Sequence, residues 1–180
     1  PCTSFTTILM AKANERIVIN HMYFQPTPAI MQALIEAAER GVKIKIITSG
    51  VYADCPNSHF IFGPRNKFNE AHLINSLSQE ARKNVEIYEY QQKRKGNHKK
   101  VIIVDDTVIA GSSNLGYKSL VTMSDHEINF FAKSKRFAAE TYKVCEIDME
   151  HSKTITGKIS LTANEYFEAG MHRVMAPLIG

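Results

Sequence analysis

Short apolar runs alternate with longer stretches of helical periodicity along this chain. Runs rich in β-branched residues predict strands, and apolar residues that recur every three or four positions predict helices. The predicted strands cover 16–20, 42–48, 85–90, 101–104, 108–110 and 127–131, and the predicted helices cover 29–40, 67–82, 134–147 and 161–175. This alternation indicates an α/β fold, and we expect a mixed, mostly parallel sheet with helices on both faces.

The helix at 29–40 has the clearest boundaries. Thr27 can cap its first turn through the side-chain hydroxyl, and Pro28 suits the first helical position. Gly41 can take the backbone conformation that ends a helix. The polar stretch 49–64 contains glycine and proline and predicts a loop of a length often used for function.

The chain has 180 residues, which is enough for one sizeable domain and short for two. It is 44% hydrophobic and 22% charged and contains no repeat or long linker, which argues against disordered, collagen-like and coiled-coil proteins and predicts a single domain over 1–180. No apolar run reaches the ~20 residues that cross a bilayer. The first residue is Pro1 rather than Met, as in a piece of a longer protein, so cytoplasmic and membrane-associated locations both stay open.

Five of the 22 Lys and Arg residues stand between 93 and 100. Without them the chain carries 17 basic and 18 acidic residues, so the whole positive excess belongs to this basic stretch. Such a concentrated charge suits either a solvated loop or a local anion site, rather than a broad surface that wraps a nucleic-acid duplex.

Candidate chemistry begins at the end of the basic stretch. His98, Lys100 and Asp105 form a His-x-Lys-x4-Asp pattern, and residues 111–114 read Gly-Ser-Ser-Asn. His98 and Lys100 occupy alternate positions entering a strand, so they point to the same face. Residues 111–114 follow the next predicted strand, where a helix would begin and donors can face an anion. An imidazole beside an ammonium and amide donors suits phosphoryl transfer through histidine, because the imidazole attacks phosphorus while the donors hold its oxygens.

This combination resembles the phospholipase D superfamily, whose signature is a His-Lys-Asp motif followed by Gly-Ser-x-Asn. The similarity extends to the second half of cardiolipin-synthase-like members, in the segments 17–26, 31–42, 87–90, 114–120, 127–129 and 155–179. The resemblance implies a phospholipase D-like lobe, either complete in itself or the C-terminal half of a two-lobe protein.

The resemblance also implies roles for single residues. His98 is the nucleophile that becomes phosphohistidine, or the general acid, depending on which motif copy starts the reaction. Lys100 and Asn114 bind the phosphate, with Ser112 as a supporting donor. Glu127 hydrogen-bonds the far ring nitrogen of His98 and holds its tautomer.

Asp105 is expected to be structural, pairing within the strand–turn region although it belongs to the catalytic motif. His21 and Tyr23 lie where the family's pocket wall would be, so both are candidate substrate contacts; for His21 a satisfied surface histidine is the alternative. The family implies no metal and no cofactor. Cys55, His59 and His72 are conceivable metal ligands, but a Cys-x3-His spacing without a second ligand pair is a weak signal, so no metal site is expected.

The chain departs from the family's pattern in three ways. Five residues separate Asp105 from Gly111 where the family usually has six, which makes the turn one residue tighter. Gly116 and Lys118 replace the Asp and Arg that cardiolipin synthases tend to carry. The chain holds one His-Lys-Asp copy where the family's active site uses two, and His151 is not followed by the rest of the motif. A second histidine is therefore expected from an identical chain in a twofold dimer or from a missing N-terminal half.

These observations predict a phosphodiesterase or phosphatidyltransferase that acts on phospholipid through a phosphohistidine. The first alternative is a metal-independent dimeric endonuclease of the same superfamily, with nucleic acid contacted by the basic stretch. The second is an inactive or scaffolding lobe that needs a partner half. The sequence leaves hydrolysis and transfer equally open.

Overall fold

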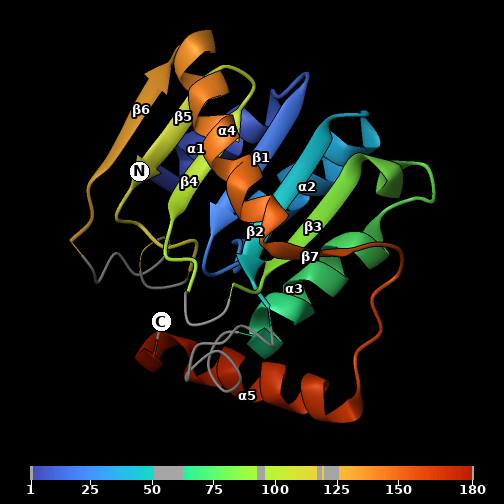
Figure 1. Cartoon of the computed structure of the whole chain (residues 1–180). Helices are drawn as coiled ribbons and strands as arrows, with labels where there is room; N and C mark the ends of the chain where they lie inside the picture. The colour runs from blue at the N-terminus through green and yellow to red at the C-terminus, as the bar shows by residue number, and fades with distance from the viewer. Residues whose placement is uncertain (1, 51–62, 93–95, 117–118, 120–125, 180) are drawn as a thin grey trace.

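A computed structural model describes residues 2–50, 63–92, 96–116, 119 and 126–179. Their seven strands form one sheet in the order β6–β5–β4–β1–β2–β3–β7 (Figure 1). The strands are β1 (Arg16–His21), β2 (Lys43–Ser49), β3 (Val85–Tyr90), β4 (Lys100–Val104), β5 (Thr107–Gly111), β6 (Asn129–Lys133) and β7 (Ser152–Ile155).

Helices cover both faces of this sheet. They are α1 (Cys2–Ala11), α2 (Pro28–Glu39), α3 (Gly63–Ser76), α4 (Lys135–Glu150) and α5 (Ala163–Ile179), with a short 3-10 helix at Ala81–Asn84. Figure 1 shows α4 in front of the sheet and α1 and α2 behind it. Helix α5 packs on α3. The predicted α/β fold with a mixed sheet and helices on both faces is confirmed.

The expectation that most strand pairs are parallel is wrong. Only β1–β2 and β2–β3 are parallel, whereas β1–β4, β4–β5, β5–β6 and β3–β7 are antiparallel. The connection from β4 to β5 is the two residues Asp105 and Asp106, and a parallel neighbour would need a crossover of a dozen residues or more. The apolar run of β4 is explained by helices on both sides rather than by parallel pairing.

The predicted boundaries hold best where local signals are strong. Thr27 caps α2 by accepting a hydrogen bond from the backbone N of Ile30 at 3.3 Å, and Gly41 takes a φ of +94° after the helix. Strand β6 begins two residues later than predicted, and α1 and β7 have no counterpart in the prediction. Most of the predicted loop at 49–64 lies outside the described residues. The described residues 112–116 are not helical, and most of the segment after them lies outside the description.

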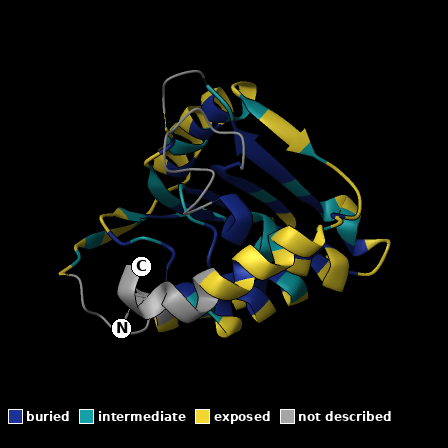
Figure 2. Cartoon of the chain, turned by 90° about the horizontal axis from the view of Figure 1, so that it is seen from below, coloured by how far each residue is buried: buried dark blue, intermediate teal, exposed yellow. Residues whose placement is uncertain are grey.

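The two faces of β1 explain how the sheet holds both helical layers. Ile17 and Ile19 belong to the core beneath α1 and α2, while Val18 belongs to the core beneath α4. Full burial of an aliphatic side chain of this size stabilises the fold by about 2 kcal/mol. Figure 2 shows the resulting pattern, in which the central strands are buried, the edge strand β6 is largely exposed, and the helices are exposed on their outer sides. Among the described helices, none is both long and apolar enough to cross a membrane.

Candidate active site

His98 and Lys100 lie together at the start of β4. The Nζ atom of Lys100 is 3.2 Å from Nε2 of His98 and also donates a hydrogen bond to the His98 backbone carbonyl at 3.2 Å. His98 is exposed and Lys100 is half-buried. Burial lowers the pKa of Lys100, and the charge of Glu127 partly opposes that effect. The ammonium is therefore positioned to share an anion with the imidazole.

His21 faces this pair from the neighbouring strand. It is the register partner of Lys100 in the antiparallel β1–β4 pair, and it is 5% exposed. Burial and, to a smaller extent, the nearby charge of Lys100 together lower the pKa of His21 to about 3. The ring is consequently neutral at physiological pH, and the alternative of a surface histidine is wrong.

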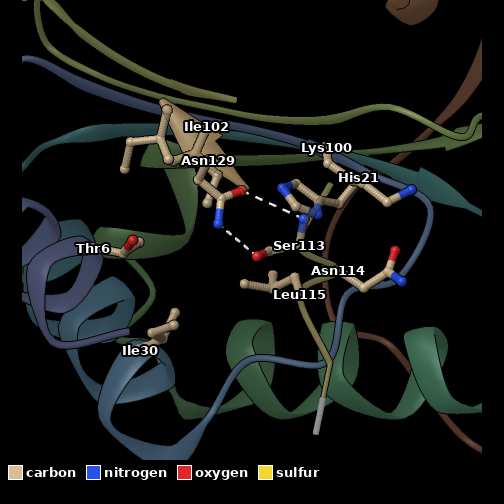
Figure 3. Close-up of a pocket in the computed structure, with 10 residues that line it drawn as sticks. Thr6, His21, Ile30, Lys100, Ile102, Ser113, Asn114, Leu115 and Asn129 are labelled. Carbon is tan, nitrogen blue, oxygen red and sulfur yellow. Dashed lines mark hydrogen bonds between the residues drawn. The ribbon is translucent and has the colours of Figure 1, made fainter. Parts of the chain in front are cut away.

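The cavity beside Lys100 is lined by both polar and apolar side chains. Figure 3 shows His21 directed into it, near Asn129, with Lys100 and Asn114 at the same opening. Its polar lining residues are Thr6, His21, Lys100, Ser113, Asn114 and Asn129. Ile30, Ile102, Ile109 and Leu115 form the apolar remainder. The Oδ1 atom of Asn114 is buried and has no hydrogen-bond partner within the described part of the chain.

Ser112 is hydrogen-bonded to Glu127, whereas the His98 ring is not. The Ser112 hydroxyl donates a short hydrogen bond to Glu127, and Ser119 donates another at 2.8 Å. No bond from the His98 ring to Glu127 occurs among the described residues, which differs from the expected contact. The topology explains this, because Glu127 precedes β6 while His98 precedes β4, and β5 lies between these strands.

Gly111 allows the two segments to approach each other. A Cβ atom at this position would lie 2.7 Å from the Cα of Asn129 and would also collide with the Ile128 carbonyl. With glycine there, Ser112 accepts a hydrogen bond from the Ile128 backbone N at 2.9 Å, and Ser113 accepts one from the Asn129 amide at 2.5 Å. The glycine therefore fixes the polar wall of the cavity.

Asp105 lies at the far end of β4 from Lys100. Its carboxylate accepts hydrogen bonds from the backbone N–H groups of Asn14, Glu15 and Arg16 at 2.9–3.0 Å. Burial alone would raise the pKa of Asp105, but these donors and the Arg16 charge hold it below its usual value. Its φ of +50° is in the left-handed region, which Asp tolerates better than most residues. The carboxylate thus ties the β4–β5 turn to the start of β1.

Tyr23 is not among the residues that line the cavity. It is half-buried and interacts electrostatically with Arg65 of α3. Of the weak zinc candidates, Cys55 and His59 lie outside the described residues. Within the described part of the chain, no group of three or more His, Cys, Asp or Glu side chains could hold a metal ion.

Sequence reasoning missed Ser113, Asn129 and Thr6 as parts of the cavity. Ser113 and Asn129 stand beside residues that were identified, but their mutual contact depends on the pairing of β5 with β6. Thr6 belongs to α1, for which no helix was predicted. The one signal in the sequence is the spacing of two residues between Glu127, which precedes β6, and Asn129, its first residue, since alternate residues of an extended chain point to the same side.

Comparisons with known proteins identify the family of this chain. Residues 7–149 match the family described as "Cardiolipin synthase, PLD-like domain". Cardiolipin synthase A of Pseudomonas putida is 26% identical over 99% of this chain, and the match covers 34% of that protein. The chain thus spans about a third of the length of the curated relatives it matches.

Solved structures share the fold. Nuc from Salmonella typhimurium, a phospholipase D family member, has a TM-score of 0.62 at 20% identity, covering 86% of this chain and 90% of that chain. Phosphatidylserine synthase from Haemophilus influenzae has a TM-score of 0.72 at 14% identity, covering 96% of this chain and 41% of that chain. The expected family is confirmed by the match to its model: the chain belongs to the cardiolipin synthase, PLD-like domain family of the phospholipase D superfamily.

Proposed function

We propose that this chain is one lobe of a phosphodiesterase or phosphatidyltransferase that acts on phospholipid, with His98 as the nucleophile. The observation that carries the proposal is the 3.2 Å approach of Lys100 Nζ to His98 Nε2, beside a cavity lined by Asn114. The preference for lipid rests on the similarity to cardiolipin synthases over 99% of the chain.

The reaction has two steps. A ring nitrogen of His98 attacks phosphorus, a nitrogen–phosphorus bond forms, and the bond to the leaving alcohol breaks. The leaving oxygen takes a proton from a histidine of a second lobe. Water or another alcohol then attacks phosphorus and gives its proton back to that histidine, and the bond to His98 breaks.

The described side chains divide the remaining tasks. Lys100 carries the positive charge that the phosphate oxygens need, and Asn114 adds an amide donor. Ser112 and Glu127 hold each other, so we assign to them the positioning of the loop that carries Asn114. His21 stays neutral and offers a hydrogen bond without a second charge.

The second lobe is part of the proposal because the chain contains one His-Lys-Asp copy. Two sources are compatible with the comparisons: the chain covers 90% of Nuc, as a self-contained lobe would, and 41% of the phosphatidylserine synthase chain, as one part of a longer protein would. Exposed apolar side chains next to Glu127 support the presence of a second lobe that covers this surface. Ile128 is 83% exposed, and Phe130 and Phe131 are about half exposed.

A nucleic-acid phosphodiesterase is the second candidate, favoured by the basic stretch that leads to His98. One of its five basic residues, Lys99, is paired with Asp148 within the chain, and Lys100 is assigned to the reacting phosphate in either candidate. This lowers the number of charges free for a phosphate backbone and makes lipid the first choice.

The test incubates the protein with labelled phosphatidylglycerol vesicles and, separately, with plasmid DNA, both with EDTA and both beside the His98→Gln variant. Cleavage or transfer of the lipid label that His98→Gln abolishes supports the first candidate, and plasmid cleavage supports the second. Light scattering reports whether the chain is a dimer. Activity only after addition of a separate second lobe identifies a half-enzyme, and inactivity in every combination indicates a scaffolding lobe.

A further inference from the structure

The residues on either side of His98 belong to a closed ring of hydrogen bonds on the α4 side of the sheet. The Asn97 amide donates to Asn20 at 2.7 Å, and the Asn20 amide donates to Asp148 at 2.7 Å. The Lys99 ammonium donates to both oxygens of Asp148 at 2.7 Å, and the Lys99 backbone N donates to Asn97 at 3.1 Å. We call these four residues, Asn20, Asn97, Lys99 and Asp148, the polar ring.

Alternation along the chain explains why the polar ring surrounds His98 without touching substrate. Asn97 and Lys99 point to the α4 side, so His98 and Lys100 are left on the other side. His98 is exposed, whereas Asn97 is 3% exposed. The proposed nucleophile His98 is thus exposed, while the residues directly before and after it are held by the hydrogen bonds of the polar ring.

Because the polar ring is buried, the loss of one of its hydrogen-bond partners should be costly. Asn20 is fully buried and Asp148 is 4% exposed, so a lost partner cannot be replaced by bulk water. Asp148 is on α4, fifty residues after His98 in the sequence, and α4 packs on the sheet through Ala138 and Cys145. The helix therefore fixes the backbone at 97–99 relative to β1.

We propose that Asp148 and Lys99 are positioning residues, which hold His98 in line with phosphorus through the polar ring. This inference rests on the proposed function, because it assigns His98 as the nucleophile. Misplacement of a reacting group by about 1 Å can cost on the order of 100-fold in rate. Loss of the ring should consequently lower kcat more than it changes KM.

The experiment compares Lys99→Met, Asp148→Asn and Lys99→Arg in the assembled, active protein. Glu140→Gln is the matched control, because Glu140 forms an exposed ion pair with Arg136 on the same helix. We expect Lys99→Met and Asp148→Asn to lower kcat by about 10- to 100-fold with KM changed less than about threefold. Lys99→Arg keeps the ion pair and should retain kcat within about threefold, and Glu140→Gln should behave like the wild type.

An NMR measurement separates this inference from the proposed function. The ring signals of His98 should shift or broaden in Lys99→Met and Asp148→Asn, while those of the exposed His72 on α3 stay unchanged. The side chain of Lys99 is 40% exposed, so Lys99→Met should remain folded even if Asp148→Asn does not. Unchanged His98 signals and unchanged kcat in folded Lys99→Met would overturn the inference. If the wild type turns over no substrate, the proposed function fails, and the NMR comparison alone decides whether the ring orders His98.

Discussion

His21 and Lys100 are register partners across β1 and β4, with a buried imidazole beside an ammonium. The pair carries one positive charge rather than two, because burial and the Lys100 charge hold the pKa of His21 at about 3. For the proposed phosphodiester substrate, which is a monoanion, this pair supplies a single fixed positive charge and leaves the proposed nucleophile His98 to react.

The first prediction concerns His21 and pH. The unfolded chain protonates His21 below pH 6.5, but the folded chain does not until about pH 3, so stability is lost as pH falls through this window. The free energy of unfolding should fall by about 2 kcal/mol between pH 7 and pH 5 from this group alone. His21→Gln should lack that component in urea unfolding at the two pH values.

The control for this measurement is His151→Gln, which replaces an exposed histidine. It should keep the pH dependence of the wild type. The same dependence in His21→Gln as in the wild type would show that His21 titrates like an ordinary histidine.

Lys100→Met should remove anion binding while keeping the length of the side chain. We expect turnover to fall by about 100- to 1000-fold, since one charged donor to the developing phosphate charge is lost. Inorganic phosphate, followed by 31P NMR, should also bind more weakly. The pKa of His21 should rise, because the Lys100 charge is one of the two causes that lower it. Lys43→Met, an exposed change at the start of β2, should alter none of these three quantities.

Gly111→Ala should separate β5 from β6. The added Cβ would lie 2.7 Å from Asn129 Cα, which the backbone cannot accept without moving. We expect a loss of about 1–3 kcal/mol in the free energy of unfolding and a marked loss of activity, because the Ser112–Glu127 contact is broken. Gly170→Ala in α5, where a Cβ meets nothing within 4 Å, is the control. Equal behaviour of the two variants in urea unfolding would contradict this account of Gly111.

Asp105→Ala should lower stability without changing the chemistry. It leaves three backbone N–H groups without their acceptor and places alanine at a φ of +50°, so we expect a loss of about 2–4 kcal/mol. Asp105→Asn should lose less, because asparagine tolerates this φ and keeps one acceptor. The kcat of the folded variants should stay within about threefold of the wild type. A large fall in kcat with full stability would instead make Asp105 part of the chemistry.

Local sequence patterns were enough to predict most of the helices and strands and to identify the His-Lys-Asp motif. β-branched runs identified six of the seven strands, and Thr27 and Gly41 marked the ends of α2. The direction of the strands was not predicted correctly, because an apolar run looks alike in a parallel and a covered antiparallel strand. The helix over 2–11 and the strand over 152–155 were not predicted at all.

The missed features of the site depend on contacts between distant residues. The polar ring joins Asn20 to Asp148 across 128 residues, and Lys99 was interpreted only as part of a basic stretch. The Glu127 contact expected from the family is replaced by hydrogen bonds that Glu127 accepts from Ser112 and Ser119, and the strand order separates Glu127 from His98. Composition and spacing carry no information about such pairs, because the sheet brings them together only after it forms.

The two-residue connection between β4 and β5 also constrains how this lobe can change. His98 precedes the first strand of the β4–β5 hairpin and Asn114 follows the second, so both lie at its open end. The length of the turn therefore decides which residues meet there. One inserted residue after Asp106 would advance the second arm by one position and reverse the sides of Ser113 and Asn114. A change in the length of this bend therefore acts on the side chains at the open end of the hairpin, although the bend itself lies at the other end of both strands.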